Sequence, residues 1–170
     1  MKTIARIALC AAAALALPVM APRAGEQSDR LARGAYLVSI MDCAGCHAPR
    51  GPGGAPVPGA GLSGGTVGFE IPGLGVFWPS NLTPHASGLA GWSEADIIRT
   101  LRTGTAPDGL VLAPVMPFPA YAAMKEDDLV AIAAYLRSLE PEAGTAQEPV
   151  ADSSAARLPF YRVTLPGAGQ

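Results

Sequence analysis

Metal-ligating and basic side chains are scarce in this sequence. Its 170 residues include two histidines and three cysteines, and 12 lysines and arginines stand against 14 aspartates and glutamates. A structural zinc site needs four cysteine or histidine ligands at suitable spacing. Apart from Cys10 and a cluster at residues 43–47, only His85 is available for such a site. Because phosphate binding requires a basic face, the small number of basic residues argues against a nucleic-acid partner.

Long apolar runs are absent beyond the N-terminus. Lys2 and Arg6 precede an apolar, alanine-rich run over residues 7–20, and small residues follow it. This order is typical of a secretory signal peptide, which we predict over residues 1–24 without fixing its cleavage site. The alternative is a membrane anchor, but the run is shorter than the roughly 20 residues that span a bilayer. We therefore expect an exported, periplasmic protein with no membrane span after cleavage.

Hydrophobic periodicity predicts three helices in the remaining chain. They cover residues 29–41, 94–103 and 126–139. Ser93 and Asp96 are spaced as a capping box at the start of the second helix, with Asp in place of the usual Glu. Gly34 interrupts the apolar stripe of the first helix. It is either a tolerated defect or a position where another helix approaches closely.

Glycine and proline dominate the connections between these helices. Few regular elements are expected over residues 48–80, because this stretch is dense in both residues. Loops of such length in a compact domain are usually functional or disordered, and a bound group would give this loop something to wrap around. After one domain over residues 25–140, we expect an extended C-terminal arm over residues 141–170. Phe160 and Tyr161 are predicted to pin part of that arm.

Cys43-Ala-Gly-Cys46-His47 is a C-x-x-C-H motif, which is typical of covalent haem attachment. Each thiol adds to a haem vinyl group, so the two must reach both sides of one ring edge, and the next residue brings an imidazole to the iron. A disulfide-exchange motif needs no histidine at that position and usually lies in a thioredoxin-like unit, which we do not find. We therefore predict one covalent haem c on Cys43 and Cys46, with His47 as an iron ligand.

Taken with its surroundings, the motif resembles that of a class I cytochrome c. It follows an N-terminal helix, Val115-Met116-Pro117 lies far downstream, and the last helix carries Tyr135-Leu136-Arg137. The resemblance implies an all-α fold of a few helices and long loops around one haem. In that family a glycine of the first helix meets an aromatic residue of the last. Gly34 and Tyr135 match those two roles.

Three further strings narrow the resemblance. They are Phe77-Trp78-Pro79-Ser80-Asn81-Leu82-Thr83-Pro84, Gly91-Trp92-Ser93-Glu94-Ala95-Asp96-Ile97-Ile98 and Met116-Pro117-Phe118-Pro119-Ala120-Tyr121. Together they resemble the cytochrome subunits and domains that accept electrons from periplasmic alcohol, gluconate and related dehydrogenases. The similarity runs from about Leu31 to Leu139. Those subunits often carry three haem units, whereas this chain has one C-x-x-C-H motif.

The resemblance implies Met116 as the sixth iron ligand, because it lies in a loop far after His47 and precedes Pro117, as in the family. A thioether ligand raises the reduction potential of a haem. His85 is the rival ligand, although a lone histidine in a loop is more often exposed to solvent. If His47 and Met116 fill both axial positions, the haem exchanges electrons and has no open position for oxygen or peroxide.

By resemblance alone, Trp78, Asn81 and Thr83 are assigned to hydrogen bonds with a haem propionate; the alternative for Trp78 is a plain core residue. No Ser-His-Asp set, phosphate-binding glycine loop or paired-carboxylate site is convincing. We expect an electron carrier, not an enzyme, that accepts electrons from a periplasmic dehydrogenase and passes them to a downstream cytochrome or oxidase of the respiratory chain. The alternatives are an integral haem subunit of a dehydrogenase complex, and a haem sensor or peroxidase with an open axial site.

Overall fold

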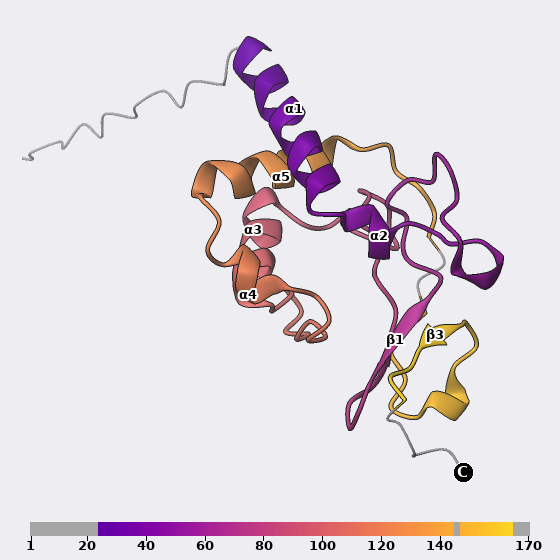
Figure 1. Ribbon diagram of the computed structural model, residues 1–170. Coiled ribbons are helices and arrows are strands. Elements are labelled where there is room, and N and C mark those ends of the chain that lie inside the picture. Colours follow the sequence, from indigo (N-terminus) through magenta and orange to yellow (C-terminus); the bar gives the residue numbers. More distant parts are fainter. Residues whose placement is uncertain (1–23, 145–146, 165–170) are drawn as a thin grey trace, which may run out of the picture.

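The computed structural model describes residues 24–144 and 147–164, so the predicted leader lies outside it except for Ala24. The helices are α1 (Ala24–Ile40), α2 (Cys43–His47), α3 (Glu94–Thr103), α4 (Phe118–Tyr121) and α5 (Glu126–Ser138), and the strands are β1 (Gly68–Ile71), β2 (Gly75–Phe77) and β3 (Phe160–Tyr161). Two 3₁₀ turns, η1 (Pro52–Gly54) and η2 (Ser153–Ala155), complete the regular structure of the described residues. In Figure 1, α1, α3, α4 and α5 gather on one side of α2 and the strands on the other.

The first and last helices cross in close contact, as the resemblance predicted. A Cβ atom built at Gly34 would lie 2.6 Å from the Cβ of Tyr135 and would overlap the backbone carbonyl of Ala131. Only glycine therefore permits this crossing. Arg33 joins the same two helices through an ion pair with Asp128, with Nη2 2.8 Å from Oδ1. The predicted first helix is confirmed, although it begins five residues earlier than expected.

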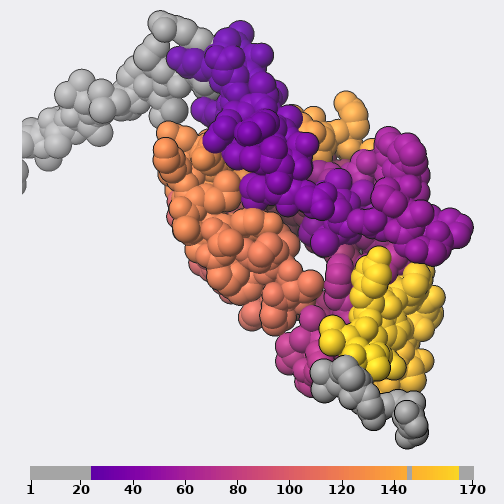
Figure 2. Space-filling model, viewed as in Figure 1, coloured from indigo at the N-terminus to yellow at the C-terminus, as the bar shows by residue number. Residues whose placement is uncertain are grey.

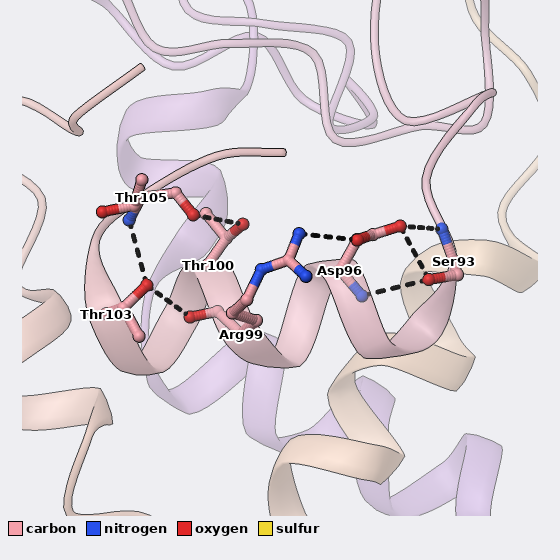
Figure 3. A network of polar contacts seen from close by, with 6 residues as sticks. All are labelled: Ser93, Asp96, Arg99, Thr100, Thr103 and Thr105. Atoms are coloured by element: carbon pink, nitrogen blue, oxygen red, sulfur yellow. Dashed lines mark hydrogen bonds and ion pairs between the residues drawn. The ribbon is translucent and has the colours of Figure 1, made fainter. Parts of the chain in front are cut away.

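Local signals define α3, which lies over the residues predicted for it. The Ser93 hydroxyl accepts from the backbone N–H of Asp96 at 3.1 Å, and the Asp96 carboxylate accepts from the backbone N–H of Ser93 at 3.0 Å (Figure 3). This reciprocal pair is the predicted capping box. The helix ends at Gly104, whose left-handed φ of 69° suits glycine.

The buried core lies where α1, α3 and α5 meet. It contains Leu37, Val38, Leu62, Leu89, Ile97, Ile132, Ala133 and Leu136. Leu62 belongs to the glycine-rich loop, so that loop is anchored in the core although it has little regular structure. Within the described residues, no helix combines the length and the apolar character needed to cross a bilayer.

A small sheet corrects the expectation of a strictly all-α fold. Within the stretch expected to be irregular, β1 and β2 form an antiparallel hairpin, and β3 pairs parallel with the other edge of β1. The hairpin turn contains Pro72 and Gly73, and Gly73 has a φ of 79°. The N–H of Leu74 donates to the carbonyl of Ile71 at 2.9 Å. Pro-Gly at the centre of a four-residue turn is typical of type II geometry. The pair marks a turn within the stretch expected to be irregular, although it does not by itself indicate a hairpin.

Candidate functional site

The three residues of the attachment motif share one short helix, α2. Cys43 is half-buried and Cys46 is exposed, and neither forms a disulfide. Their spacing of three residues places both thiols on neighbouring positions of one helix face. Burial raises the pKa of the Cys43 thiol to about 11 and also raises that of Cys46. Both side chains are therefore protonated thiols at neutral pH, available for covalent attachment.

His47 is buried and held by its Nδ1 atom. Nδ1 lies 2.7 Å from the backbone carbonyl oxygen of Ser80. Since a carbonyl can only accept, Nδ1 carries the proton and Nε2 carries the lone pair. Burial lowers the pKa of His47, which keeps the ring neutral. A neutral imidazole whose other nitrogen donates to a carbonyl is the usual form of a histidine that binds a metal.

Two glycines bring a second loop against the backbone of the motif. The N–H of Gly64 donates to the carbonyl of His47 at 2.8 Å, and the N–H of Gly65 donates to the carbonyl of Pro79 at 2.9 Å. A Cβ at Gly65 would overlap the carbonyl oxygen of Cys46. The loop therefore lies directly between α2 and the segment that holds the His47 ring.

Arg50 is a further residue of this site, and it was not identified from the sequence. Its guanidinium donates to the carbonyl of Gly45 within α2 and to the carbonyl of Gly54 at 3.3 Å. Its backbone N–H donates to the hydroxyl of Thr66 at 2.8 Å, and that hydroxyl is 2.9 Å from the carbonyl of Arg50. Arg50 thus ties α2 to the loop that follows it. No sequence signal marked this role, because its partners are mostly backbone carbonyls.

Met116 lies half-buried in the turn just before α4. Its N–H donates to the carbonyl of Ala113 at 2.9 Å, and its carbonyl accepts from the N–H of Phe118 at 2.8 Å. The ring of Phe118 packs on Gly104 at the end of α3, where a Cβ would come within 2.6 Å of it. These contacts fix the position of the turn relative to α3.

Tyr121 places α4 near the attachment motif. Burial raises the pKa of Tyr121, and the thiolate forms of Cys43 and Cys46, where present at high pH, raise it further. Figure 2 shows an opening between the salmon and orange part of the chain and the magenta part that carries the hairpin.

The rival ligand, His85, is engaged in a local turn. Its Nδ1 accepts from the backbone N–H of Ser87 at 3.1 Å and lies 2.9 Å from the Ser87 hydroxyl. Because Nδ1 accepts, the proton of the neutral ring is on Nε2, and no free lone pair is presented. His85 therefore differs from His47, whose Nε2 makes no hydrogen bond to the described residues.

The structure gives Trp78, Asn81 and Thr83 partners within the protein. The Trp78 indole donates to the carbonyl of Pro159 at 3.2 Å. The Asn81 amide donates to the carbonyl of Glu142 at 2.8 Å, and its Oδ1 accepts from the backbone N–H of Thr83, also at 2.8 Å. Pro159 and Glu142 lie beyond α5 in sequence, so these contacts connect the loop to the C-terminal arm. The assignment of the three side chains to a haem propionate stays a prediction.

The residues at α2 fit a covalent haem. Two free thiols and one neutral imidazole with a free nitrogen are the donors that such a group requires. Cys43 also belongs to a set of half-buried apolar side chains that border the core. The set includes Met41, Leu82, Trp92, Ile98, Leu101, Met124, Tyr135 and Leu139. A large apolar ring system attached beside them would bury surface that the protein alone leaves partly open.

Comparisons with known proteins agree with this chemistry. A sequence model of the family described as cytochrome c matches residues 31–140. The chain is 36% identical over 104 residues to the gluconate 2-dehydrogenase cytochrome c subunit of Pantoea cypripedii, covering 61% of this chain and 22% of that protein. It is 30% identical over 147 residues to the fructose dehydrogenase cytochrome subunit of Gluconobacter japonicus, covering 85% and 27%.

The alcohol dehydrogenase (quinone) cytochrome c subunit of Gluconobacter oxydans is 30% identical over 130 residues, covering 73% of this chain and 25% of that protein. The chain thus spans between 22% and 27% of the length of these three relatives. The family match covers more than half of the chain and includes α2, the loop of Met116 and α5. This chain therefore belongs to the cytochrome c family, whose members carry covalently bound haem.

Proposed function

We propose that the chain is an exported electron carrier with a single haem c, bound through Cys43 and Cys46 and ligated by His47 and Met116. The observation that carries this proposal is the state of His47, a neutral, buried ring with Nδ1 held by Ser80 and Nε2 free. The single C-x-x-C-H motif supports one haem. The leader predicted over residues 1–24 supports export to the periplasm.

Within this proposal, bound haem supplies one-electron cycling of its iron between the ferrous and ferric states. Cys43 and Cys46 would hold it through thioether bonds. The Nδ1–H group of His47 donates a hydrogen bond to the backbone carbonyl of Ser80, which raises the basicity of Nε2 and orients the ring. Met116 would supply a thioether sulfur, which favours the reduced state. With both axial positions filled, the role of the protein is electron transfer, not catalysis.

The ligand assignment is tested by absorption spectra of the purified holoprotein and of Met116→Ala. The wild type is expected to give a six-coordinate low-spin spectrum with the weak sulfur-to-iron band of the ferric state, and Met116→Ala to lose that band. Met124→Ala is the matched methionine control, because Met124 packs against the core, and it should keep the band. His85→Ala should also keep it. An unchanged spectrum for Met116→Ala, or a high-spin wild type, would contradict the assignment.

The electron donor is proposed to be a periplasmic dehydrogenase, with a downstream cytochrome or oxidase as acceptor. The relatives support this, because their names describe cytochrome subunits of gluconate, alcohol and fructose dehydrogenases. The same names favour a second candidate, in which the chain is a fixed subunit of such a complex. Co-purification of the chain with a large dehydrogenase subunit would favour the second candidate. A chain that purifies as a monomer and is reduced by a separately purified dehydrogenase would favour the first.

A haem sensor or peroxidase is the third possibility, and it requires an axial position that opens. Carbon monoxide binding to the untreated, reduced wild-type protein would support it. We expect no binding at neutral pH in the wild type and rapid binding in Met116→Ala. This difference would also show that Met116 closes the sixth position.

A further inference from the structure

The chain turns back after α5 and runs along the β1–β2 hairpin and the loop that follows it. We define the C-terminal strap as residues 142–144 and 147–162. At its far end, the N–H of Val76 donates to the carbonyl of Val150 at 2.8 Å, and the N–H of Val150 donates back at 3.0 Å. Arg162 pairs with Glu70 of β1, with Nη2 2.9 Å from Oε1. The strap is therefore attached to both strands of the hairpin, as the yellow segment beside β1 shows in Figure 1.

At its near end, the strap is bound by two side chains that have almost no exposed surface. Asn81 is 0% exposed and Thr83 is 1% exposed. The Asn81 amide donates to the carbonyl of Glu142 at 2.8 Å, and the Thr83 hydroxyl accepts from the N–H of Glu142 at 3.1 Å. The two side chains also contact each other, with Thr83 Oγ1 2.8 Å from Asn81 Oδ1. Such a buried, mutually satisfied network gives this junction a defined geometry.

Both loops that hold His47 touch this end of the strap. Ser80, whose carbonyl accepts from His47 Nδ1, directly precedes Asn81 in the chain. A Cβ at Gly144 would overlap the carbonyl oxygen of Ser63, the neighbour of Gly64. Gly64 in turn donates to the backbone carbonyl of His47 at 2.8 Å. The strap is thus linked to the ring of His47 through the segment of Ser80 and Asn81, and to the backbone of His47 through the loop of Ser63 and Gly64.

From this arrangement we infer that the C-terminal strap positions the axial histidine, with Thr83 and Gly144 as positioning residues. The inference rests on the proposed haem function. The loops around His47 are rich in glycine, so their own backbone preferences hold them weakly. The strap supplies the external contacts that fix the Ser80 carbonyl against Nδ1. If the strap is loosened, the hydrogen bond from His47 Nδ1 to the Ser80 carbonyl weakens. The basicity of Nε2 then falls, and the ferric iron is stabilised less.

The test compares Gly144→Ala and Thr83→Val with the wild-type holoprotein. Gly144→Ala inserts a methyl group between the strap and Ser63, and Thr83→Val removes the hydroxyl that binds Glu142. The readouts are the exchange rate of the His47 Nδ1–H proton by NMR and the reduction potential. We expect exchange to become faster by about tenfold or more through more frequent local opening, and the potential to rise. Gly91→Ala is the matched glycine control, because a Cβ there meets nothing within 4 Å.

A second control separates positioning from simple stabilisation. Leu129→Ala leaves a cavity at a fully buried position of α5, an element that belongs neither to the strap nor to the two loops, and lowers stability. It should leave the potential and the Nδ1–H exchange rate as in the wild type. If both strap variants lose stability but keep wild-type exchange and potential, the strap is structural only and the inference is overturned. Failure of the wild type to bind haem would overturn the proposed function instead, which the haem content of each preparation shows directly.

Discussion

The segments that carry His47 and Met116 are held in different ways. The carbonyl of His47 accepts a hydrogen bond from the glycine loop, and its ring donates one to the carbonyl of Ser80. The strap in turn holds the segment around Ser80. The segment before Met116 is held by hydrogen bonds within itself, such as Ala106 N to Leu110 O at 2.9 Å, and to the end of α3, with Leu112 N 2.8 Å from Gly104 O. Several of its apolar side chains are exposed. The protein alone therefore fixes the attachment side, whereas we expect the methionine side to gain burial from the cofactor.

Of the substitutions that compare the His47 side with the Met116 side, the one at Gly65 is expected to change the free energy of unfolding most. Gly65→Ala would place a methyl group against the carbonyl of Cys46 and 2.9 Å from Cγ of Pro79. Overpacking of this kind costs about 1–3 kcal/mol, and here the displaced backbone is that of the attachment motif. We expect the free energy of unfolding to fall by that amount and the yield of covalent haem to fall with it.

Urea unfolding measures the change in stability, and the haem content of the purified protein measures the yield of covalent attachment. A glycine just before α3 serves as the control. Gly91→Ala, where nothing lies within 4 Å, is expected to change neither quantity. A Gly65→Ala protein with wild-type stability and haem content would show that the loop yields easily and that the protein alone does not fix the attachment side.

Local signals in the sequence were enough to predict the three longer helices, α1, α3 and α5, and the haem motif, but not the short helices α2 and α4. The capping box of Ser93 and Asp96 and the glycine at position 104 define α3 with no help from the rest of the chain. The motif at Cys43 is likewise contained in five residues. The Gly34–Tyr135 crossing was predictable from the resemblance, because it depends on one glycine and one aromatic residue.

Two features that were not predicted depend on long-range backbone contacts: the partner of His47 and the pairing of β1 with β3. The partner of His47 is a carbonyl, which every residue possesses, so nothing in the sequence marks Ser80 for that role. Strands β1 and β3 pair across a separation of about 90 residues and are four and two residues long, too short for an alternating pattern to show. For the sheet, the local signal in the sequence was the Pro-Gly pair at positions 72 and 73, which indicates a turn between β1 and β2.

A smaller change in the free energy of unfolding is expected at acidic pH, where the ion pair between Arg162 and Glu70 is lost. The Arg162 guanidinium lowers the pKa of Glu70 below its usual value near 4.5. A carboxyl with a depressed pKa in the folded state stabilises the fold above its unfolded pKa, and this contribution is lost as the pH falls through the folded pKa. Glu70→Gln should therefore be less stable than the wild type at pH 7. The difference should shrink as the pH falls below the usual pKa of a glutamate and vanish once it lies below the depressed pKa of Glu70.

Urea unfolding of both proteins between about pH 3 and pH 7 would measure this dependence. Glu148→Gln is the control on the same strap, because Glu148 is exposed and forms no ion pair with the described residues. It should follow the wild-type curve throughout. A Glu70→Gln protein that does the same would mean that the Arg162 ion pair adds nothing to the attachment of the strap.

The smallest effect on stability is expected on the methionine side. Leu110 and Val111 are 55% and 65% exposed, so replacing them by serine removes little buried apolar surface. Leu110→Ser and Val111→Ser should each change the free energy of unfolding by no more than about 0.5 kcal/mol. The same exchange at Leu62, which is 8% exposed in the core, is the positive control and should be strongly destabilising. If Leu110→Ser weakens the holoprotein as Leu62→Ser does, then the segment before Met116 packs against the bound haem, and the methionine side is as firmly held as the attachment side once the cofactor is present.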